Sequence, residues 1–170
     1  MKLRVRHTCL IKDFSFYFWV LTDSETRRMM FDKKKHVWNY LFSPKCECKY
    51  ICHILRDGKW KPISFVRFTK GKRDNEYWLA GAIPKKLQNS GKGIYAAVAF
   101  ITVFFSQHPG AIIKSGSFLF NQRAYKTTLS IGFSLDKKDT SHFESSLTET
   151  QFSNDFVHHI KSKIDLLTQL

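Results

Sequence analysis

The segment from Gln88 to Gly93, with the sequence QNSGKG, constrains this chain more than any other. It lies between an apolar run that ends at Ile83 and a second apolar run from Ile94 to Phe105. Two glycines two positions apart let the backbone approach a ligand closely. A helix that starts directly after them would direct its unpaired N–H groups and positive dipole end at the same place. The segment therefore predicts a loop that binds a phosphate-bearing ligand.

Length and charge set the limits for that prediction. With 170 residues the chain can form one domain with a proper core, and we expect a single domain over residues 1–170. Its 28 lysines and arginines outnumber 14 acidic residues and give a formal net charge of +14. A charge so far from zero indicates acidic partners, such as nucleotides, nucleic acid or anionic lipid, without selecting among them.

Cysteine content and hydropathy predict the cellular setting. Four cysteines are too few and too unevenly spaced for a disulfide scaffold, so we expect reduced thiols. The apolar run from Phe14 to Leu21 is preceded by Asp13 and followed by no small-residue cleavage site, unlike a signal peptide. The apolar stretch from Gly93 to Phe105 is about seven residues too short to cross a bilayer. These patterns predict a cytoplasmic protein that does not enter a membrane.

The N-terminal third of the chain predicts one strand and two helices. Alternating apolar and charged residues from Lys2 to His7 are typical of a half-buried strand. Asp13 is expected to cap a helix that ends near Leu21, with Phe14, Phe18 and Leu21 on its buried stripe. A second short helix is expected from Lys34 to Phe42.

The rest of the chain predicts a hairpin followed by alternating strands and helices. Two strand-like runs flank Asp57 and Gly58, a dipeptide that favours a tight hairpin turn. The expected elements are strands over Cys48–Leu55, Lys61–Thr69, Glu76–Ile83 and Ala111–Ser115, helices over Ile94–Ser106, Asn121–Gly132 and Asn154–Leu167, and a weakly patterned last strand within Phe143–Thr150. This order indicates an α+β fold with a mixed, mostly antiparallel central sheet flanked by helices.

Two better-known phosphate motifs fail at the glycine loop. Gly91-x-Gly93-x-x-Ala96 matches the dinucleotide fingerprint in form, but no acidic residue follows about twenty positions later. A P-loop would need glycine at Lys86, and serine or threonine at Gly93. An ordinary turn at the start of a helix remains an alternative for the glycine pair alone.

The loop and a second segment together resemble the GNAT superfamily of acetyl-CoA-dependent N-acetyltransferases. Gln88 to Gly93 matches that family's Gln/Arg-x-x-Gly-x-Gly/Ala pyrophosphate loop, and Asn121 to Ala124 followed by Gly132-Phe133 matches its Asn-x-x-Ser/Ala and Gly-Phe motif. Near the N-terminus a looser pattern is similar to the branch that modifies protein N-termini and amino sugars; it consists of Trp19, Asp23, Arg27 and Phe31. The likeness covers residues 1–135, whereas residues 136–170 have no recognisable counterpart.

The resemblance implies acetyl-CoA as co-substrate and no metal. It implies that the strand before the loop splays from its neighbour and binds the pantetheine arm through backbone groups, and that loop N–H groups hold the pyrophosphate. The implied cofactor-binding residues are Ala82, Ile83, Gln88, Asn89, Ser90, Gly91, Lys92, Gly93, Ile94 and Asn121. Asn121 can also act as a helix N-cap. Lys85, Lys86 and Lys92 either screen the cofactor's phosphates or form a solvated face.

The catalytic residues follow the family pattern only in part. The tyrosine that commonly donates a proton to the departing thiolate falls at Thr128, a much poorer acid. Tyr125, one helical turn earlier, is a candidate replacement. Glu76, at the start of the third expected antiparallel strand, is the candidate general base. Direct attack within a well-oriented complex, without a dedicated acid, is the alternative.

A metal site is not expected at the cysteine cluster. Cys46, Cys48 and Cys52 have the spacing Cys-x-Cys-x3-Cys, which no common zinc motif shares, and no second ligand pair follows. Alternate residues of a strand share one face, so these cysteines and Tyr50 are expected to form an ordinary buried surface.

Three functions of different classes remain after these arguments. The leading one is an N-acetyltransferase acting on a primary amine of an amino sugar, a protein N-terminus or a small molecule. The second is a catalytically weak coenzyme A or nucleotide-binding module, because of Thr128. The third is a basic nucleic-acid-binding protein, which the core-like spacing of the aromatic residues disfavours. The many phenylalanines also favour self-association as a homodimer.

Overall fold

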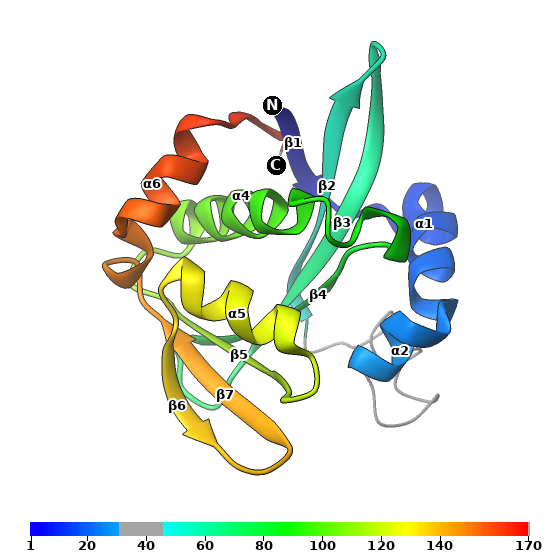
Figure 1. Ribbon diagram of the computed structural model, residues 1–170. Coiled ribbons are helices and arrows are strands. Elements are labelled where there is room, and N and C mark those ends of the chain that lie inside the picture. The colour runs from blue at the N-terminus through cyan, green and yellow to red at the C-terminus, as the bar shows by residue number, and fades with distance from the viewer. Residues whose placement is uncertain (31–45, 170) are drawn as a thin grey trace.

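The computed structural model describes residues 1–30 and 46–169, which form one eight-stranded sheet with helices on both faces (Figure 1). The strand order is β6-β7-β5-β4-β3-β2-β1-β8. Most neighbouring strands are antiparallel, and the parallel pairs are β4 with β5 and β1 with β8. The expected α+β fold with a mixed, mostly antiparallel sheet is confirmed.

The elements alternate in a way that places the ends of β4 and β5 beside two helix starts. The strands are β1 (Lys2–His7), β2 (Cys46–Arg56), β3 (Lys59–Lys70), β4 (Glu76–Ala82), β5 (Ile112–Phe118), β6 (Ser134–Lys138), β7 (His142–Leu147) and β8 (Asp165–Gln169). The helices are α1 (Leu10–Thr22), α2 (Ser24–Met30), α4 (Lys92–Gln107), α5 (Gln122–Ile131) and α6 (Asp155–Ser162), with short 3-10 turns η1 (Lys85–Leu87) and η2 (Gln151–Ser153).

Alternate residues of the central strands supply two separate cores. Val66 and Phe68 of β3 point toward α4, and the Phe68 ring stacks on Phe104 with centroids 3.9 Å apart. Phe65, which directly precedes Val66, points toward α1, where it contacts Tyr17 at 4.3 Å between centroids. The period-two alternation of a strand therefore fixes a three-layer arrangement, with α4 and α6 on one face of the sheet and α1 on the other.

The hairpin and the two motif-bearing helices form as expected. Asp57 and Gly58 both have positive φ, of 54° and 69°, as a two-residue hairpin turn requires. Helix α5 is capped by the Asn121 side chain, which accepts a hydrogen bond from the Ala124 N–H at 3.2 Å. The helix ends at Gly132, whose φ is 106°. The expected helix over Lys34–Phe42 lies outside the described residues.

The expected cap of α1 is wrong, and so are two of the three residues of its expected buried stripe. The helix begins four residues earlier, at Leu10, with Cys9 in the N-cap position. Asp13 lies inside the helix, where it accepts two hydrogen bonds from Arg6 at 2.6 and 2.8 Å and one from the Cys9 N–H at 2.9 Å. This ion pair with β1 rotates the helix, so Phe14 and Phe18 are exposed, whereas Leu21 is buried as expected. The other buried residues of the helix include Phe16, Tyr17 and Val20.

The C-terminal expectations are wrong in two places. Helix α6 begins at the predicted Asn154 cap but ends at Ser162, and residues 165–169 form strand β8 beside β1. The Asp165 N–H donates to the Met1 carbonyl at 2.9 Å, so the first strand supplies the pairing that makes this polar segment a strand. Strand β6 was also missed because all five of its residues are exposed and carry no apolar alternation.

Within the described parts of the chain, none of the helices has the length and apolar character needed to cross a membrane.

A buried histidine predicts how stability depends on pH. His53 lies opposite Arg4 in the β1–β2 ladder and is 5 % exposed. Burial, together with the charges of Arg6 and Arg4, lowers the pKa of His53 to about 4. The unfolded chain, with a pKa near 6.5, therefore binds the proton more strongly than the folded chain.

We expect the free energy of unfolding to fall by up to about 3 kcal/mol as pH decreases from about 6.5 to 4. In the His53→Gln variant, which cannot be protonated at this position, that fall should be largely absent. Urea unfolding at pH 7.5, 5.5 and 4.5 measures it. Equal slopes in the two proteins would contradict the assignment.

Candidate active site

The candidate site begins where the parallel strands β4 and β5 separate. Strands β4 and β5 pair through Glu76–Ile112, Tyr77–Ile113 and Trp78–Lys114, and the ladder ends there although both strands continue. The gap between the diverging strands opens into a cavity of about 1110 Å³. Its lining comes from β3, β4, β5 and β7, from the loop before α4, and from α4 and α5. In Figure 1, α4 and α5 follow the ends of β4 and β5 on the same side of the sheet.

The loop before α4 has the geometry of a cradle. Asn89 and Gly91 both have positive φ, of 61° and 74°, and Gly91 is the N-cap of α4. A Cβ added at Gly91 would have no atom of the described residues within 4 Å, so the loop faces open space. The first N–H groups of α4, at Lys92 and Gly93, have no partners within the helix. These groups and the helix dipole together favour an anion at this place.

Side chains within the loop fix its path. The Gln88 Nε2 donates to the Ile83 carbonyl at 3.3 Å, and the Ser90 hydroxyl donates to the Leu87 carbonyl at 2.5 Å. Arg123 on the first turn of α5 donates to Gln88 Oε1 at 2.5 Å. The loop is therefore tied both to the strand before it and to the neighbouring helix.

Helix α5 forms the opposite wall of the same half of the cavity. Asn121 lines the cavity, and its Nδ2 donates to the Ser117 hydroxyl at 3.3 Å. Thr128, two turns further along α5, also lines the cavity and is 8 % exposed. This half thus has polar side chains on both walls and backbone N–H groups at the loop.

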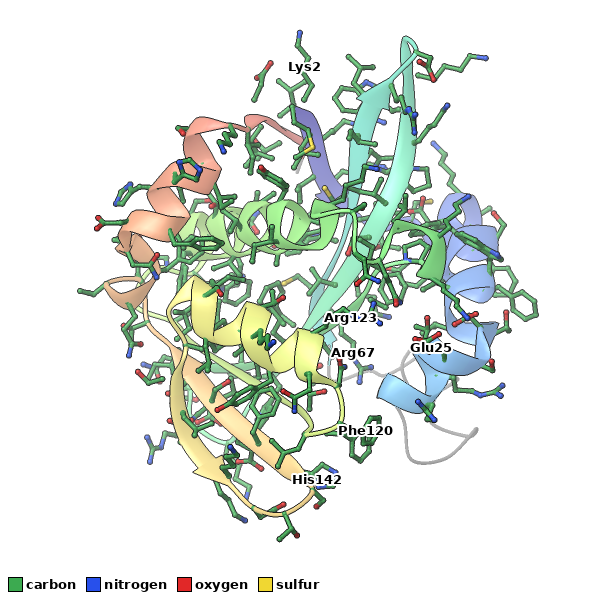
Figure 2. The ribbon with its side chains drawn as sticks, in the orientation of Figure 1. Lys2, Glu25, Arg67, Phe120, Arg123 and His142 are labelled. Atoms are coloured by element: carbon green, nitrogen blue, oxygen red, sulfur yellow. The ribbon has the colours of Figure 1, made fainter. Side chains whose placement is uncertain are left out.

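The other half of the cavity lies on the opposite face of the sheet. Glu144 of β7 pairs with Gly116 of β5, and a Cβ at Gly116 would lie 3.7 Å both from Glu144 Cγ and from the Trp78 ring. Phe118 lies 4.4 Å from the His142 ring, measured between centroids. All of these side chains line the cavity, so its second half combines aromatic surfaces with a carboxylate. Figure 2 shows His142 and Phe120 at this lower end of the sheet.

Comparison with known proteins rests on structure alone. No protein-family model and no curated protein sequence matches the chain. An acetyltransferase of the GNAT family from Bacillus anthracis superposes with a TM-score of 0.70 at 14 % identity, covering 88 % of this chain and 96 % of its own. The aminoglycoside acetyltransferase AAC(6')-Ib, in complex with ribostamycin and coenzyme A, gives 0.70 at 14 % identity, with 91 % and 98 % covered. Ribosomal-protein-S5-alanine acetyltransferase from Vibrio fischeri gives 0.66 at 12 % identity, with 88 % and 94 % covered.

The chain has the GNAT fold. The splay of β4 from β5, which the resemblance implied for residues 79–83, is present in the strand pairing. The looser N-terminal pattern lies partly outside the described residues, since Phe31 is not described. Of its other members, Asp23 accepts a hydrogen bond from the Thr26 N–H at 2.8 Å and so caps α2, and Trp19 lies under Lys86 at 4.6 Å.

On this GNAT fold most of the predicted cofactor-binding residues come together. Those that line the cavity are Ala82, Ile83, Gln88, Asn89, Gly91, Gly93, Ile94 and Asn121. Ser90, which is exposed, and Lys92, which is half-buried, belong to the loop without lining the cavity. The binding roles of all ten residues remain predictions.

Among the predicted catalytic residues, the structure brings only Thr128 to the cavity. Glu76 lies at the opposite end of β4, in the pair with Ile112 before the splay begins. The Tyr125 ring packs edge-on against Phe143 at 5.0 Å, and Lys138 lies over it at 5.2 Å, so it is directed toward β6 and β7. Both residues were chosen from their positions in the sequence. Residues one or two positions apart on a strand or a helix can point in different directions, so sequence position alone did not predict where these side chains lie.

Residues 136–147 supply cavity residues that the sequence did not indicate. Asp139 at the β6–β7 turn accepts hydrogen bonds from the backbone N–H groups of Ser141 and His142, which lower the pKa of its carboxyl to about 2. Asp139, His142 and Glu144 line the cavity. A sequence signal could have placed these residues on a strand. Phe143, Ser145 and Leu147 are buried and alternate with more exposed residues, so His142 and Glu144 share the opposite face.

The cysteine cluster is a buried face, as expected, for the members that the structure describes. Cys48, Tyr50 and Cys52 are buried in the core beneath α4. Burial raises the pKa of the Cys52 thiol to about 12, which makes it a poor nucleophile and ligand. The Cys46 side chain lies outside the described residues, and no cluster of three or more metal-ligating side chains occurs in the parts that are described.

Proposed function

We propose that this protein is an acetyl-CoA-dependent N-acetyltransferase that transfers acetyl to a primary amine. The observation that supports it most is the continuity of the cavity. One space joins the glycine loop to the half that contains Glu144, and it passes through the gap between β4 and β5. Such a passage lets a thioester reach an acceptor on the opposite face of the sheet, while the phosphates stay at the loop.

The cofactor would bind with its pyrophosphate on the N–H groups of the loop and of the first turn of α4. Its pantetheine arm would follow the exposed edge of β4 at Ala82 and Ile83, with the Asn121 amide on the other side. Because the ladder with β5 ends at Trp78, an extended amide chain can lie along this edge. The acyl end would then lie near Thr128.

The reaction needs one proton acceptor and one proton donor. The amine nitrogen attacks the acetyl carbonyl, the new C–N bond forms, and the C–S bond breaks to release the thiolate of coenzyme A. Glu144 is the proposed base, acting through a water molecule, because it lines the acceptor half whereas Glu76 does not. The Thr128 hydroxyl is the proposed hydrogen-bond donor that stabilises the departing thiolate, which takes its proton from water, and Tyr125 is not required.

The acceptor half favours a cationic amine. Glu144 and Asp139 supply negative charge, and Trp78 and Phe118 supply aromatic faces, so an ammonium group finds partners on several sides. Solved structures with this fold include an enzyme crystallised with ribostamycin and one named for ribosomal-protein-S5 alanine. We therefore propose an amino sugar or a protein N-terminus ahead of a neutral small amine.

Binding of acetyl-CoA is tested by thermal unfolding. At a hundredfold excess over Kd, a ligand stabilises the folded state by about 2.7 kcal/mol, which corresponds to a Tm increase of about 5–10 °C. The Gly91→Asp variant should lose this increase because its carboxylate would face the pyrophosphate. Gly110→Asp is the matched control, because Gly110 has nearly the same φ of 73° and equally open surroundings, away from the cavity.

A wild-type Tm that does not change at millimolar acetyl-CoA would refute the proposal. Transfer itself is tested by thiol release over a panel of amino sugars, N-terminal peptides and small amines. Binding without thiol release on the whole panel would leave a coenzyme A-binding module as the function.

A further inference from the structure

A single carboxylate joins two cations that lie beside the phosphate loop. The Glu25 carboxylate of α2 lies 3.0 Å from Lys85 Nζ and 3.6 Å from an Arg123 guanidinium nitrogen. Arg123 in turn donates to Gln88, the first residue of the loop. Figure 2 shows Glu25 on α2 and Arg123 at the start of α5, on facing elements. Three segments that are distant in sequence therefore meet through one negative charge.

The position of the cations suits a phosphate better than a carboxylate. Lys85 lies in η1, directly before the loop, and Arg123 and Gln88 both line the cavity. The Lys85 and Arg123 side chains are 65 % and 49 % exposed, so their ion pairs with Glu25 are in contact with water and are weak. A phosphate has more charge than a carboxylate, and its oxygens match the planar guanidinium fork.

We propose that Glu25 is the counter-ion of Lys85 and Arg123 in the free protein and that the phosphates of coenzyme A displace it. This inference rests on the proposed function, because it takes coenzyme A as the ligand of the loop. The two cations then contact the cofactor, and the carboxylate is left facing incoming negative charge. Glu25 lowers the affinity for the cofactor, in contrast to the loop residues, which raise it.

Displacement of Glu25 also affects α2, a helix on the acceptor side of the cavity. Thr26, the next residue of α2, lines the cavity, and Arg28 lies over the Phe120 ring at 5.7 Å. When Glu25 is released, the Arg28–Phe120 contact still joins α2 to the segment after β5. Cofactor binding thus removes the ion pairs that join α2 to Lys85 and Arg123, and α2 forms part of the acceptor wall.

The first test is the affinity of Glu25→Gln for coenzyme A, measured by calorimetry at low ionic strength. Removal of the competing charge should tighten binding about fivefold. Asp74→Asn is the matched control, because Asp74 is fully exposed at the β3–β4 turn and forms only a 3.9 Å pair with Lys70. It should leave the affinity unchanged. A Glu25→Gln variant that binds as the wild type does, or more weakly, overturns the proposal.

A double-mutant cycle separates this role from a structural one. Arg123→Met should weaken coenzyme A binding about tenfold, whereas Lys61→Met on the β2–β3 hairpin should have no effect. In the Arg123→Met background the gain from Glu25→Gln should shrink, because one of the two competed cations is gone. If Glu25 merely holds α2 in place, its replacement lowers Tm without tightening binding, and the gain does not appear.

A third measurement distinguishes the failure of this proposal from that of the function. Pantetheine lacks phosphates, so Glu25→Gln should not improve its binding. A wild-type protein that binds no coenzyme A would refute the proposed function and this proposal together. A wild type that binds coenzyme A, with Glu25→Gln no tighter, refutes the counter-ion role alone.

Discussion

The Glu144→Gln variant is expected to lower kcat about a hundredfold on the best acceptor of the amine panel. The amide keeps the size of the side chain beside Trp78 and Gly116 but cannot take a proton. Because Glu144 lies on the acceptor side of the sheet, the Kd for acetyl-CoA should stay within twofold of the wild-type value. Steady-state kinetics and calorimetry with the same preparation measure both quantities.

The proton-transfer role can be separated from loss of charge. Glu144→Asp retains a carboxylate and should recover part of the rate. Glu149→Gln removes one negative charge from the exposed turn after β7 and should leave kcat unchanged. An acceptor whose nitrogen is already uncharged at neutral pH, such as an arylamine, should lose less rate in Glu144→Gln. A kcat within threefold of the wild type would rule out Glu144 as the base.

The Gly132→Ala variant is expected to lose about 3 kcal/mol of stability, or about 10 °C in Tm. Gly132 ends α5 with a φ of 106°, which an L side chain adopts only with strain. A Cβ there would also lie 2.4 Å from the Gln151 carbonyl oxygen and 2.6 Å from Asn154 Nδ2. Asn154 cannot withdraw without loss, because it caps α6 and donates to the Ile131 carbonyl at 3.0 Å.

A matched glycine separates backbone strain from steric overlap. Gly58→Ala introduces the same side chain at a φ of 69°, where no atom of the described residues lies within 4 Å. It should cost only about 1 kcal/mol. Urea unfolding of the two variants measures the difference. Equal losses would show that the contact with the α6 cap contributes nothing.

Local chemistry explains why part of the structure follows from the sequence. The turn at Asp57-Gly58, the Asn121 cap and the Gly132 end each depend on residues adjacent in the chain, and all three form as expected. The loop from Gln88 to Gly93 also belongs to this class. Its positive φ at Gly91 and its place before α4 follow from glycine and from an apolar helix that begins directly afterwards.

Long-range pairing explains the errors. The buried face of α1 is set by the Arg6–Asp13 ion pair with β1, so helical periodicity alone selected Phe14 and Phe18 wrongly. Strand β8 exists because β1 offers a free edge, and its own sequence Asp-Leu-Leu-Thr-Gln has no strong strand pattern. Energies of such contacts depend on partners that are distant in the chain.

The sequence by itself predicted where a phosphate ligand would bind, because a glycine loop and a helix start are complete within a few consecutive residues. Only the tertiary structure decided what faces that ligand. The end of the β4–β5 ladder opens the passage through the sheet, and strand register places Glu144 beside it while leaving Glu76 at the closed end. Register and splay are properties of neighbouring strands, and no single segment encodes them.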